Sequence, residues 1–506
     1  MISKVIVGST GPVLIMTGVI YDMAKNIGVP FLTFYAWVSV WTFVYTTVTA
    51  FFDWTRFVKL ATRFTDDIFA LLIVSIFILN AIGSPFGSGG LLRYMDPNHK
   101  IHVDYEKELE AGNIEDYNYL KTAILSILIG LATTATIFAL RGLKESPYLC
   151  NQLSRNSLHD FAVTIAVILW AVLKHVAFPT VELEELNVPD AFEPTFNCCN
   201  AECTLSWPDE CPDLTSPIGT RSWFADMSDL NGKQYAIGVA AGPALLAFIL
   251  LYLDNGITWH LIYSPRNKLQ HGDSYNWDLF LNGLCNLING LLGLPWLVAT
   301  TVPCIVHVNN LTEKDQDGNI VSVQENRLTY LISHLLVGLS LLFLPAMKMI
   351  PMPVLLGVFL FMGLSSIGRI DFWNRFLMFF QQPSLYKKEA FTKYMKISRY
   401  HMFTIIQLCF FAGVFMVQNT KSIAIAFPFM TLMCIPGRLY LLPKIFENWE
   451  LLLLDGEEEE IEHWIQQKEN IGETVHIEPD DGSGDEQDAE INSSKRFPIR
   501  LLEDEE

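Results

Sequence analysis

The chain has 506 residues, of which 51% are hydrophobic and 17% charged, and apolar blocks recur along most of its length. No soluble core explains so many apolar blocks, so the composition predicts a polytopic α-helical membrane protein and excludes a soluble globular one. The formal net charge of −20 is concentrated in residues 455–506, which hold 19 acidic and 4 basic residues, and the membrane part is therefore close to neutral.

The first apolar segment begins almost at the N-terminus and is interrupted. Thr10-Gly11-Pro12 precedes an apolar helix that is too short to span a bilayer by itself, since a crossing helix needs about 20 apolar residues. Further spans are expected at residues 32–52, 68–82, 120–140 and 161–178.

The apolar run at residues 242–262 contains a carboxylate. Asp254 lies near its inner end, and Thr258 follows four residues later, which places both oxygen-bearing side chains on one helical face. An ionisable group inside a membrane helix is costly and therefore indicates a functional site. The alternative is that Asp254 lies at the cytoplasmic headgroup level, because His260 and Arg266 follow soon after.

The next apolar run begins at residue 277 and is interrupted at Gly293-Leu294-Pro295. We expect Pro295 to open a short helix over residues 296–302, which is too brief to span alone. The free N–H groups and the positive dipole at such a helix start attract an anion at mid-membrane depth. The alternative is that Pro295 only kinks an ordinary spanning helix.

Two proline-opened half-helices in corresponding places predict inverted repeats with a central substrate site. We expect both helix starts to converge on one anion, and the substrate-binding residues predicted there are Thr10, Gly11, Pro12, Val13, Pro295, Ala299, Thr300 and Thr301. Further segments are expected at residues 328–344, 354–367, 403–417 and 423–442, which gives about twelve membrane elements, two of them half-helices.

Basic residues in short loops predict the orientation, because cytoplasmic loops are enriched in Lys and Arg. They occur in alternate loops, near residues 56–63, 141–155, 266–268 and 387–399, which places both termini in the cytoplasm. The acidic loop at residues 179–233 then faces outwards. Its clustered cysteines favour disulfides first and zinc binding second; they are Cys198, Cys199, Cys203 and Cys211.

The C-terminal tail begins with an amphipathic stretch around Trp464, and residues 480–490 have too few apolar side chains to fold. We expect a solvated acidic tail or a docking site for a basic partner surface. The histidines of the membrane part occur singly, without an HExxH spacing, so the sequence does not indicate an enzyme. We expect no nucleic-acid partner.

Short motifs run through nearly the whole chain in one order: Val7-Gly8-Ser9-Thr10-Gly11-Pro12, Arg63-Phe64-Thr65-Asp66-Asp67-Ile68-Phe69, residues 243–246 with Asp254 and Ile257-Thr258, residues 293–296 with 299–302, residues 350–355 with 357–363, residues 401–404, and Leu454-Asp455. In this order the motifs are specific. By them the sequence resembles the bicarbonate transporter family, solute carrier family 4, which includes chloride/bicarbonate anion exchangers and sodium-bicarbonate cotransporters.

The resemblance implies an all-α polytopic fold of two inverted repeats of seven segments, in which a core domain that holds the substrate moves against a gate domain. It assigns residues 1–52 and 234–344 to the core, 53–178 and 345–442 to the gate, 179–233 to an extracellular cysteine-containing loop, and 443–506 to the cytoplasmic tail. It also implies that the family's first two crossings are absent from this sequence, and that gate domains pair in a homodimer.

The position of Asp254 is, in the family, a glutamate in anion exchangers and an aspartate in sodium-coupled cotransporters. The basic residue that exchangers carry after the half-helix is Pro303 here. An ionised Asp254 repels a bound anion unless a cation bridges them, because like charges about 4 Å apart cost several kcal/mol at intermediate dielectric. We therefore expect sodium, as a co-substrate, to be bound by Asp254, Thr258, Thr300 and Thr301, without any other cofactor.

The favoured function is sodium-coupled transport of bicarbonate or carbonate, with the plasma membrane as the expected location. Exchange of chloride for bicarbonate and transport of borate are the alternatives within the family. A membrane anchor or scaffold without transport is the alternative of another class.

Overall fold

The computed structural model describes residues 5–470 except for positions 61, 84–88, 100, 103–104, 106–117, 147–150, 187, 189–196, 199–218, 221–222, 264–268, 270–272, 315–319, 325, 369, 387–388, 421–422, 424–426 and 457. Most of this part is helical, and its named strands form three short antiparallel pairs.

The elements of the first part of the chain are, in order, β1 (Val7–Gly8), α1 (Gly11–Ile27), α2 (Phe31–Phe51), η1 (Trp54–Leu60), α3 (Arg63–Ile82), η2 (Leu91–Met95), α5 (Tyr119–Gly142), η3 (Leu143–Glu145), α6 (Gln152–Asp160), α7 (Ala162–Ala177), β2 (Asn197–Cys198) and β3 (Gly219–Thr220).

The elements of the second part are α8 (Ala236–Val239), α9 (Ala241–Tyr263), α10 (Tyr275–Leu292), β4 (Val298–Ala299), α11 (Thr301–Asn310), β5 (Thr312–Lys314), β6 (Ile320–Val323), α12 (Arg327–Leu339), η6 (Ser340–Phe343), α13 (Leu344–Lys348), α14 (Met352–Ile367), α15 (Asp371–Leu377), η7 (Met378–Phe380), η8 (Pro383–Leu385), α16 (Ala390–Tyr394), α17 (Ile397–Asn419), α18 (Phe427–Pro436), η10 (Gly437–Leu441), η11 (Leu442–Lys444), α19 (Asn448–Asp455) and α20 (Glu458–Asn470).

Six helical stretches of the described part are long and apolar enough to cross a membrane, or up to eight if each of two bent helix pairs counts as one span. The six are Phe31–Phe51, Arg63–Ile82, Tyr119–Gly142, Ala236–His260, Leu328–Lys348 and Ile397–Asn419. Each overlaps a span expected from the sequence, because a helix satisfies its own backbone groups while its apolar side chains face lipid or protein. The expected all-α polytopic class is confirmed, whereas the count of about twelve elements stays a prediction.

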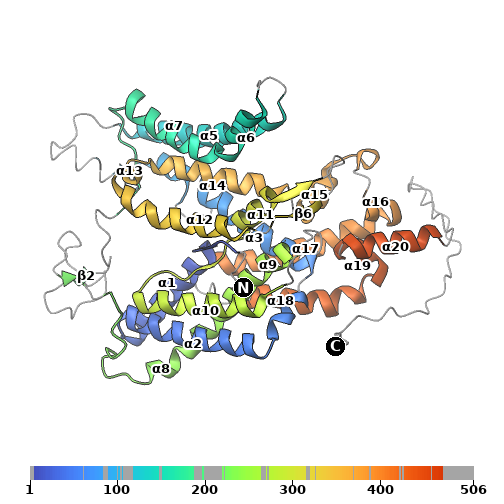
Figure 1. The fold of residues 1–506 in the computed structure, drawn as a ribbon, viewed down its shortest axis with the longest axis horizontal. Helices are drawn as coiled ribbons and strands as arrows, with labels where there is room; N and C mark the ends of the chain where they lie inside the picture. Colours follow the sequence, from blue (N-terminus) through green and yellow to red (C-terminus); the bar gives the residue numbers. More distant parts are fainter. Residues whose placement is uncertain are drawn as a thin grey trace.

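Helices α1, α2, α9 and α10 pack into one bundle, at the lower left of Figure 1. Its centre is a continuous apolar cluster that includes Val13 and Met16 of α1, Ala244 and Ala247 of α9, and the buried indole of Trp296. The bundle carries Asp254, and the start of α1 lies within it.

Glycines allow α2 and α10 to approach closely. A Cβ atom at Gly283 would lie 2.2 Å from Thr46 Oγ1, and one at Gly290 would lie 2.0 Å from Ser39 Oγ. Since these two glycines are about two helical turns apart, they form one stripe of small residues on α10. Small residues of this kind let membrane helices pack backbone to backbone.

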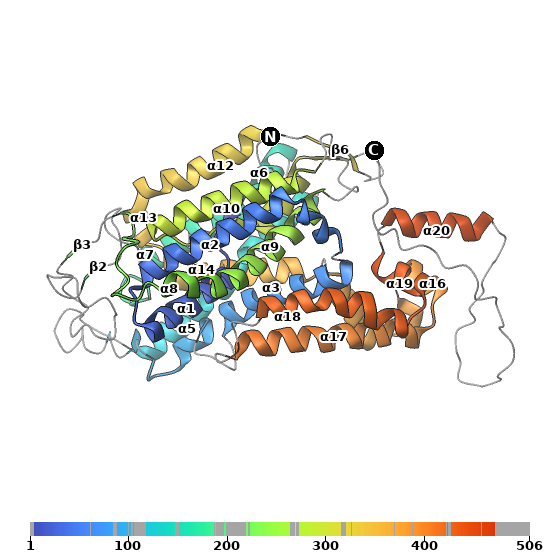
Figure 2. The ribbon, with the colours of Figure 1, turned by 90° about the horizontal axis from the view of Figure 1, so that it is seen from below.

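A second group of helices contains α3, α5, α7 and α14, and α14 contacts the other three. Figure 1 shows α14 beneath α5 and α7. Its apolar contacts include Val354 against Leu125 and Ile129, and Phe361 against Ile137. Figure 2 shows α17 and α18 side by side, with α19 and α20 beyond their ends.

Strands β1 and β4 link the segment before α1 to the segment before α11. They pair antiparallel, with Val7 opposite Ala299 and Gly8 opposite Val298. Helix α1 follows β1 and helix α11 follows β4, so two short strand–helix units meet in opposite directions. An antiparallel meeting of two such units is the local geometry that inverted repeats predict.

Helix α1 begins at Gly11, as the motif Thr10-Gly11-Pro12 predicts, whereas the start expected for the second half-helix is wrong. Helix α1 runs on to Ile27 and ends where Gly28 takes a φ of 72°. The second short helix does not begin at Pro295, because the chain there is extended, pairs as β4 and becomes helical only at Thr301. Pro303 instead lies in the first turn of α11, where the N–H that proline lacks has no helical acceptor.

Candidate functional site

A buried carboxylate on α9 lies where the two strand–helix units meet. Asp254 is 1% exposed, so it is enclosed by protein and does not lie at the molecular surface. Thr10, in the extended residue before α1, donates a hydrogen bond from Oγ1 to Asp254 Oδ2 over 3.1 Å. Among the described residues, no Lys, Arg or His forms an ion pair with Asp254. A buried carboxylate without a cationic partner is costly unless it binds a proton or a cation.

Thr258 connects Asp254 to the second strand–helix unit. Its side chain is fully buried, and its Oγ1 lies 3.0 Å from Asp254 O, 3.3 Å from Ala299 O and 2.8 Å from Thr301 Oγ1. A hydroxyl has one proton and two lone pairs, so Thr258 donates to one of the two carbonyls at a time and accepts from Thr301. Oxygen atoms from α9, β4 and α11 therefore meet at one point.

The start of α1 has neither a side-chain cap nor a negative charge of its own. Thr10 occupies the N-cap position, but no side chain caps the helix, and its first turn contains Pro12 and no acidic residue. The first N–H groups of a helix lack intrahelical acceptors and carry partial positive charge. The contact between Thr10 and Asp254 places this electropositive helix start beside the carboxylate.

The other predicted site residues lie partly in the first turn of α1 and partly just before α11. Pro12 and Val13 are buried in the first turn of α1. The Thr300 hydroxyl donates to Ile6 O over 2.8 Å, whereas its neighbour Thr301 contacts Thr258.

Of the predicted sodium ligands, the Thr258 and Thr301 hydroxyls meet beside the backbone carbonyl of Asp254, whose carboxylate accepts from Thr10. Thr300 is bonded to the segment before β1. Pro295 is exposed beyond the end of α10.

A row of asparagines explains why no helix begins at Pro295. Asn289 Nδ2 donates to Pro295 O over 3.2 Å, and Asn286 both accepts from Leu297 N at 2.7 Å and donates to Leu297 O at 2.9 Å. Asn282 Nδ2 donates to the same carbonyl over 3.0 Å. Because side-chain amides satisfy these backbone groups, the segment stays extended.

Asparagines are the site-forming residues that the sequence reasoning missed. Asn255, next to Asp254, accepts from Ala299 N over 2.8 Å and so fixes β4 against α9. The signal in the sequence was the spacing of Asn282, Asn286 and Asn289, which places three amides on one face of an otherwise apolar helix.

The expected cysteine cluster stays a prediction. Cys199, Cys203 and Cys211 lie outside the described residues, and of Cys198 only the backbone in β2 is described.

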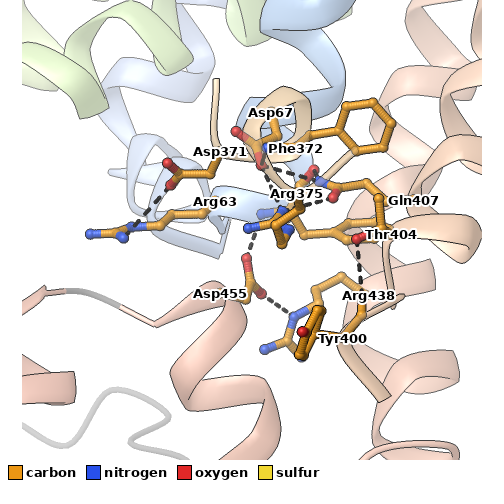
Figure 3. A network of polar contacts seen from close by, with 11 residues as sticks. Arg63, Asp67, Asp371, Phe372, Arg375, Tyr400, Thr404, Gln407, Arg438 and Asp455 are labelled. Carbon is orange, nitrogen blue, oxygen red and sulfur yellow. Dashed lines mark hydrogen bonds and ion pairs between the residues drawn. The ribbon is translucent and has the colours of Figure 1, made fainter. Parts of the chain in front are cut away.

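A second polar network lies at the start of α3, and Figure 3 shows it. Asp67 Oδ2 accepts hydrogen bonds from Phe372 N at 3.0 Å and from Arg375 Nη2 at 3.1 Å. Arg375 Nη2 also donates to Gln407 Oε1 over 2.9 Å. This network joins α3 to α15 and α17.

The same turn of α3 is bonded to the C-terminal helices. Asp455, the last residue of α19, accepts hydrogen bonds from Phe64 N and from Arg438 Nε. Both partners of the Arg438–Asp455 ion pair have side chains at most 15% exposed. The first turn of α3 is therefore held from several sides.

Comparison with protein families identifies one match over most of the chain. The family described as the HCO3- transporter integral membrane domain matches residues 3–116 and 93–459.

Two similar proteins are the Band 3 anion transport protein of Homo sapiens and the anion exchange protein 3 of Danio rerio. The first is 29% identical over 459 residues, which cover 90% of this chain and 47% of that protein. The second is 30% identical over 467 residues, which cover 90% of this chain and 38% of that protein. The chain thus spans less than half the length of either relative.

Among solved structures, the transmembrane domain of the cyanobacterial bicarbonate transporter BicA matches with a TM-score of 0.43 and 14% identity. The match covers 80% of this chain and 83% of that one.

Proposed function

This chain belongs to the HCO3- transporter family, and we propose that it carries bicarbonate or carbonate together with sodium across a membrane. The observation that carries the proposal is the buried carboxylate of Asp254, bonded to Thr10 at the start of α1 and linked through Thr258 to the start of α11. A negative side chain between two electropositive helix starts suits a cation and an anion bound side by side.

Sodium is the cation that these ligands suit. The oxygen atoms that meet at Thr258 are the Asp254 and Ala299 backbone carbonyls and the Thr301 hydroxyl, and the Asp254 carboxylate, on the same helix, accepts from Thr10. In secondary transporters, unwound backbone carbonyls and polar side chains at broken helices coordinate the coupling ion. We assign the sodium to Asp254, Thr258 and Thr301.

The anion is assigned to the N–H groups of Gly11 and Val13 at the start of α1 and of Thr301 at the start of α11, because the N–H groups of Ala299 and Thr300 already donate to Asn255 Oδ1 and Ile6 O. Each helix start carries about half a positive charge. Pro303 in the first turn of α11 brings no positive charge. Sodium therefore supplies the positive charge that still has to balance the anion and Asp254. The anion and the cation therefore depend on each other, and this dependence is the physical basis of coupling.

Transport requires one part of the protein to move against the other. We assign residues 1–52 and 234–344 to a core domain and residues 53–178 and 345–442 to a gate domain. Separate apolar clusters support this division, one around α1, α2 and α9, and others around α14 and its neighbours. The core would carry the site past the gate, so that the site opens to each side in turn.

Exchange of chloride for bicarbonate is a second candidate. It is favoured by the names of the relatives, which are an anion transport protein and an anion exchange protein. Exchange needs chloride on the opposite side of the membrane and no sodium, so the two functions differ in their ion requirements.

We further propose that the membrane is the plasma membrane, that both termini face the cytoplasm, and that gate domains pair in a homodimer. The acidic tail is proposed to dock a basic partner. The family and the apolar helices support only the coarser statement that the chain is a multi-pass integral membrane protein.

Vesicles containing the full chain and a trapped pH indicator test the function. With bicarbonate outside, an inward sodium gradient should make the lumen alkaline, and replacing sodium with potassium or omitting bicarbonate should abolish this change. Alkalinisation that needs chloride inside the vesicles and ignores sodium would establish exchange instead. No bicarbonate flux under either condition, from protein that remains folded, would favour a scaffold and overturn the proposal.

A further inference from the structure

Asp66 and His260 face each other between the two groups of helices. Asp66 belongs to the first turn of α3, and His260 lies near the end of α9. Asp66 Oδ2 and His260 Nε2 are 3.9 Å apart, and the side chains are 12% and 22% exposed. This distance is within the range of ion pairs but too long for a hydrogen bond.

The contact joins the proposed core to the proposed gate. Among the ion pairs between described residues, it is the one with a partner in each domain. The nearby pair of Arg63 and Asp371 has the same N–O distance of 3.9 Å, but both of its residues belong to the gate.

The gate side of the contact is rigidly held. The residues on both sides of Asp66 are fixed: Asp67 binds Phe372 N and Arg375, and Phe64 N donates to Asp455. Figure 3 shows these partners gathered around the start of α3. Asp66 therefore cannot follow His260 unless the surrounding gate moves as well.

The core side of the contact is mechanically connected to the site. His260 is six residues after Asp254 on the continuous helix α9, which is a separation of about 9 Å along the helix. Helix α3 also borders the start of α1, where a Cβ at Gly11 would lie 3.6 Å from Ile76 Cγ2. Helix α3 of the gate thus contacts the core at two places, at Gly11 beside the site and at His260 near the end of α9.

We propose that the contact between Asp66 and His260 is a lock that holds core and gate in the arrangement of this structure and that opens in every transport cycle. The proposal rests on the relative motion that the proposed function requires. Both are positioning residues, because they act through the domain arrangement. A sliding movement of a few ångströms separates the two side chains, since they already lie at the limit of ion-pair distance.

A cross-link between the domains measures this arrangement without any need for transport. In Gly11→Cys/Ile76→Cys chains, a short bifunctional thiol reagent should join α1 to α3, and mass spectrometry of the linked peptides gives the rate. Adding Asp66→Asn or His260→Leu should slow cross-linking roughly threefold, because a pair at the 3.9 Å limit of ion-pair distance contributes a modest stabilisation. His260→Arg supplies a permanent positive charge with a longer reach and should speed it.

The matched control is Asp371→Asn, which breaks the ion pair of equal distance inside the gate and should leave the cross-linking rate unchanged. The charge-exchanged chain Asp66→His/His260→Asp should return the rate towards its original value. In transport assays, His260→Leu should change the turnover number while leaving the KM for bicarbonate unchanged.

The experiments distinguish a failure of the lock from a failure of the proposed transport function. If the unaltered chain carries no bicarbonate but His260→Leu still slows cross-linking, the lock stands and the proposed function falls. If the chain carries bicarbonate and both Asp66→Asn and His260→Leu cross-link like Asp371→Asn, the function stands and the lock is overturned.

Discussion

Asp254 and Thr258 lie one turn apart on α9, and their side chains make different kinds of contact. Asp254 supplies a buried charge, bonded to the Thr10 hydroxyl before α1. Thr258 supplies a neutral oxygen that links α9 to Ala299 O and to Thr301. Under the proposed function, the charge selects which ions are bound, and the neutral hydroxyl holds the start of α11 in place beside α9.

Thr258→Val removes that hydroxyl and keeps the branched shape. We expect a roughly five- to hundredfold loss of sodium-driven bicarbonate flux with folding intact, because an unmade buried hydrogen bond costs about 1–3 kcal/mol and each 1.4 kcal/mol is about tenfold. Thr42→Val is the control, since Thr42 is equally buried and its hydroxyl bonds only Val38 O within its own helix. Equal flux in the two variants would remove Thr258 from the site.

Residue spacing predicted part of this arrangement. Asp254 and Thr258 were found because four residues make one helical turn and a carboxylate in an apolar helix is costly. The bond to Thr10 could not be read from the sequence, because it joins residues 244 positions apart. The contact between His260 and Asp66 joins residues 194 positions apart and is equally hidden in the sequence.

At the scale of elements, long apolar runs predicted the spanning helices well, whereas the second half-helix was misplaced. A proline after a glycine resembles a helix start, and sequence alone does not show which partners the following backbone groups find. Here Asn286 and Asn289 bind the segment after α10, and β1 then pairs with β4. These partners hold the chain extended until Thr301.

Close packing of α2 on α10 predicts a sensitive glycine. Gly290→Ala places a Cβ 2.0 Å from Ser39 Oγ, so the helices must separate or Ser39 must shift. We expect a loss of roughly 1–3 kcal/mol in the free energy of unfolding, the usual range for overpacking. The thermal midpoint of the purified protein should fall. Gly238→Ala is the control, because a Cβ there meets nothing within 4 Å, and an equal midpoint in both would contradict this packing.

For the whole molecule, the first turn of α3 is a junction. It binds α15 and α17 through Asp67, α19 through Phe64 N and Asp455, and it faces α9 through Asp66. The family resemblance assigns Asp455 to the cytoplasmic tail, residues 443–506. In the structure Asp455 is buried and bonded to Phe64 N at the start of α3.

Asp455→Ala removes the carboxylate that pairs with Arg438, whose side chain is only 15% exposed. It also removes the hydrogen-bond acceptor of Phe64 N. Breaking a buried pair by removing one partner costs about 3–5 kcal/mol. We therefore expect a large fall in thermal stability. Asp371→Asn should cost little, because that carboxylate is 50% exposed. Similar midpoints for the two variants would show that α19 is not needed to close the fold.

Uptake of radioactive sodium into vesicles that contain the full chain tests the central claim most directly. We predict that bicarbonate stimulates sodium uptake by the unaltered chain, and that Asp254→Asn abolishes this stimulation while the amount of folded protein stays the same. Bicarbonate-stimulated sodium uptake of equal size in Asp254→Asn would contradict the assignment of the cation to this buried carboxylate.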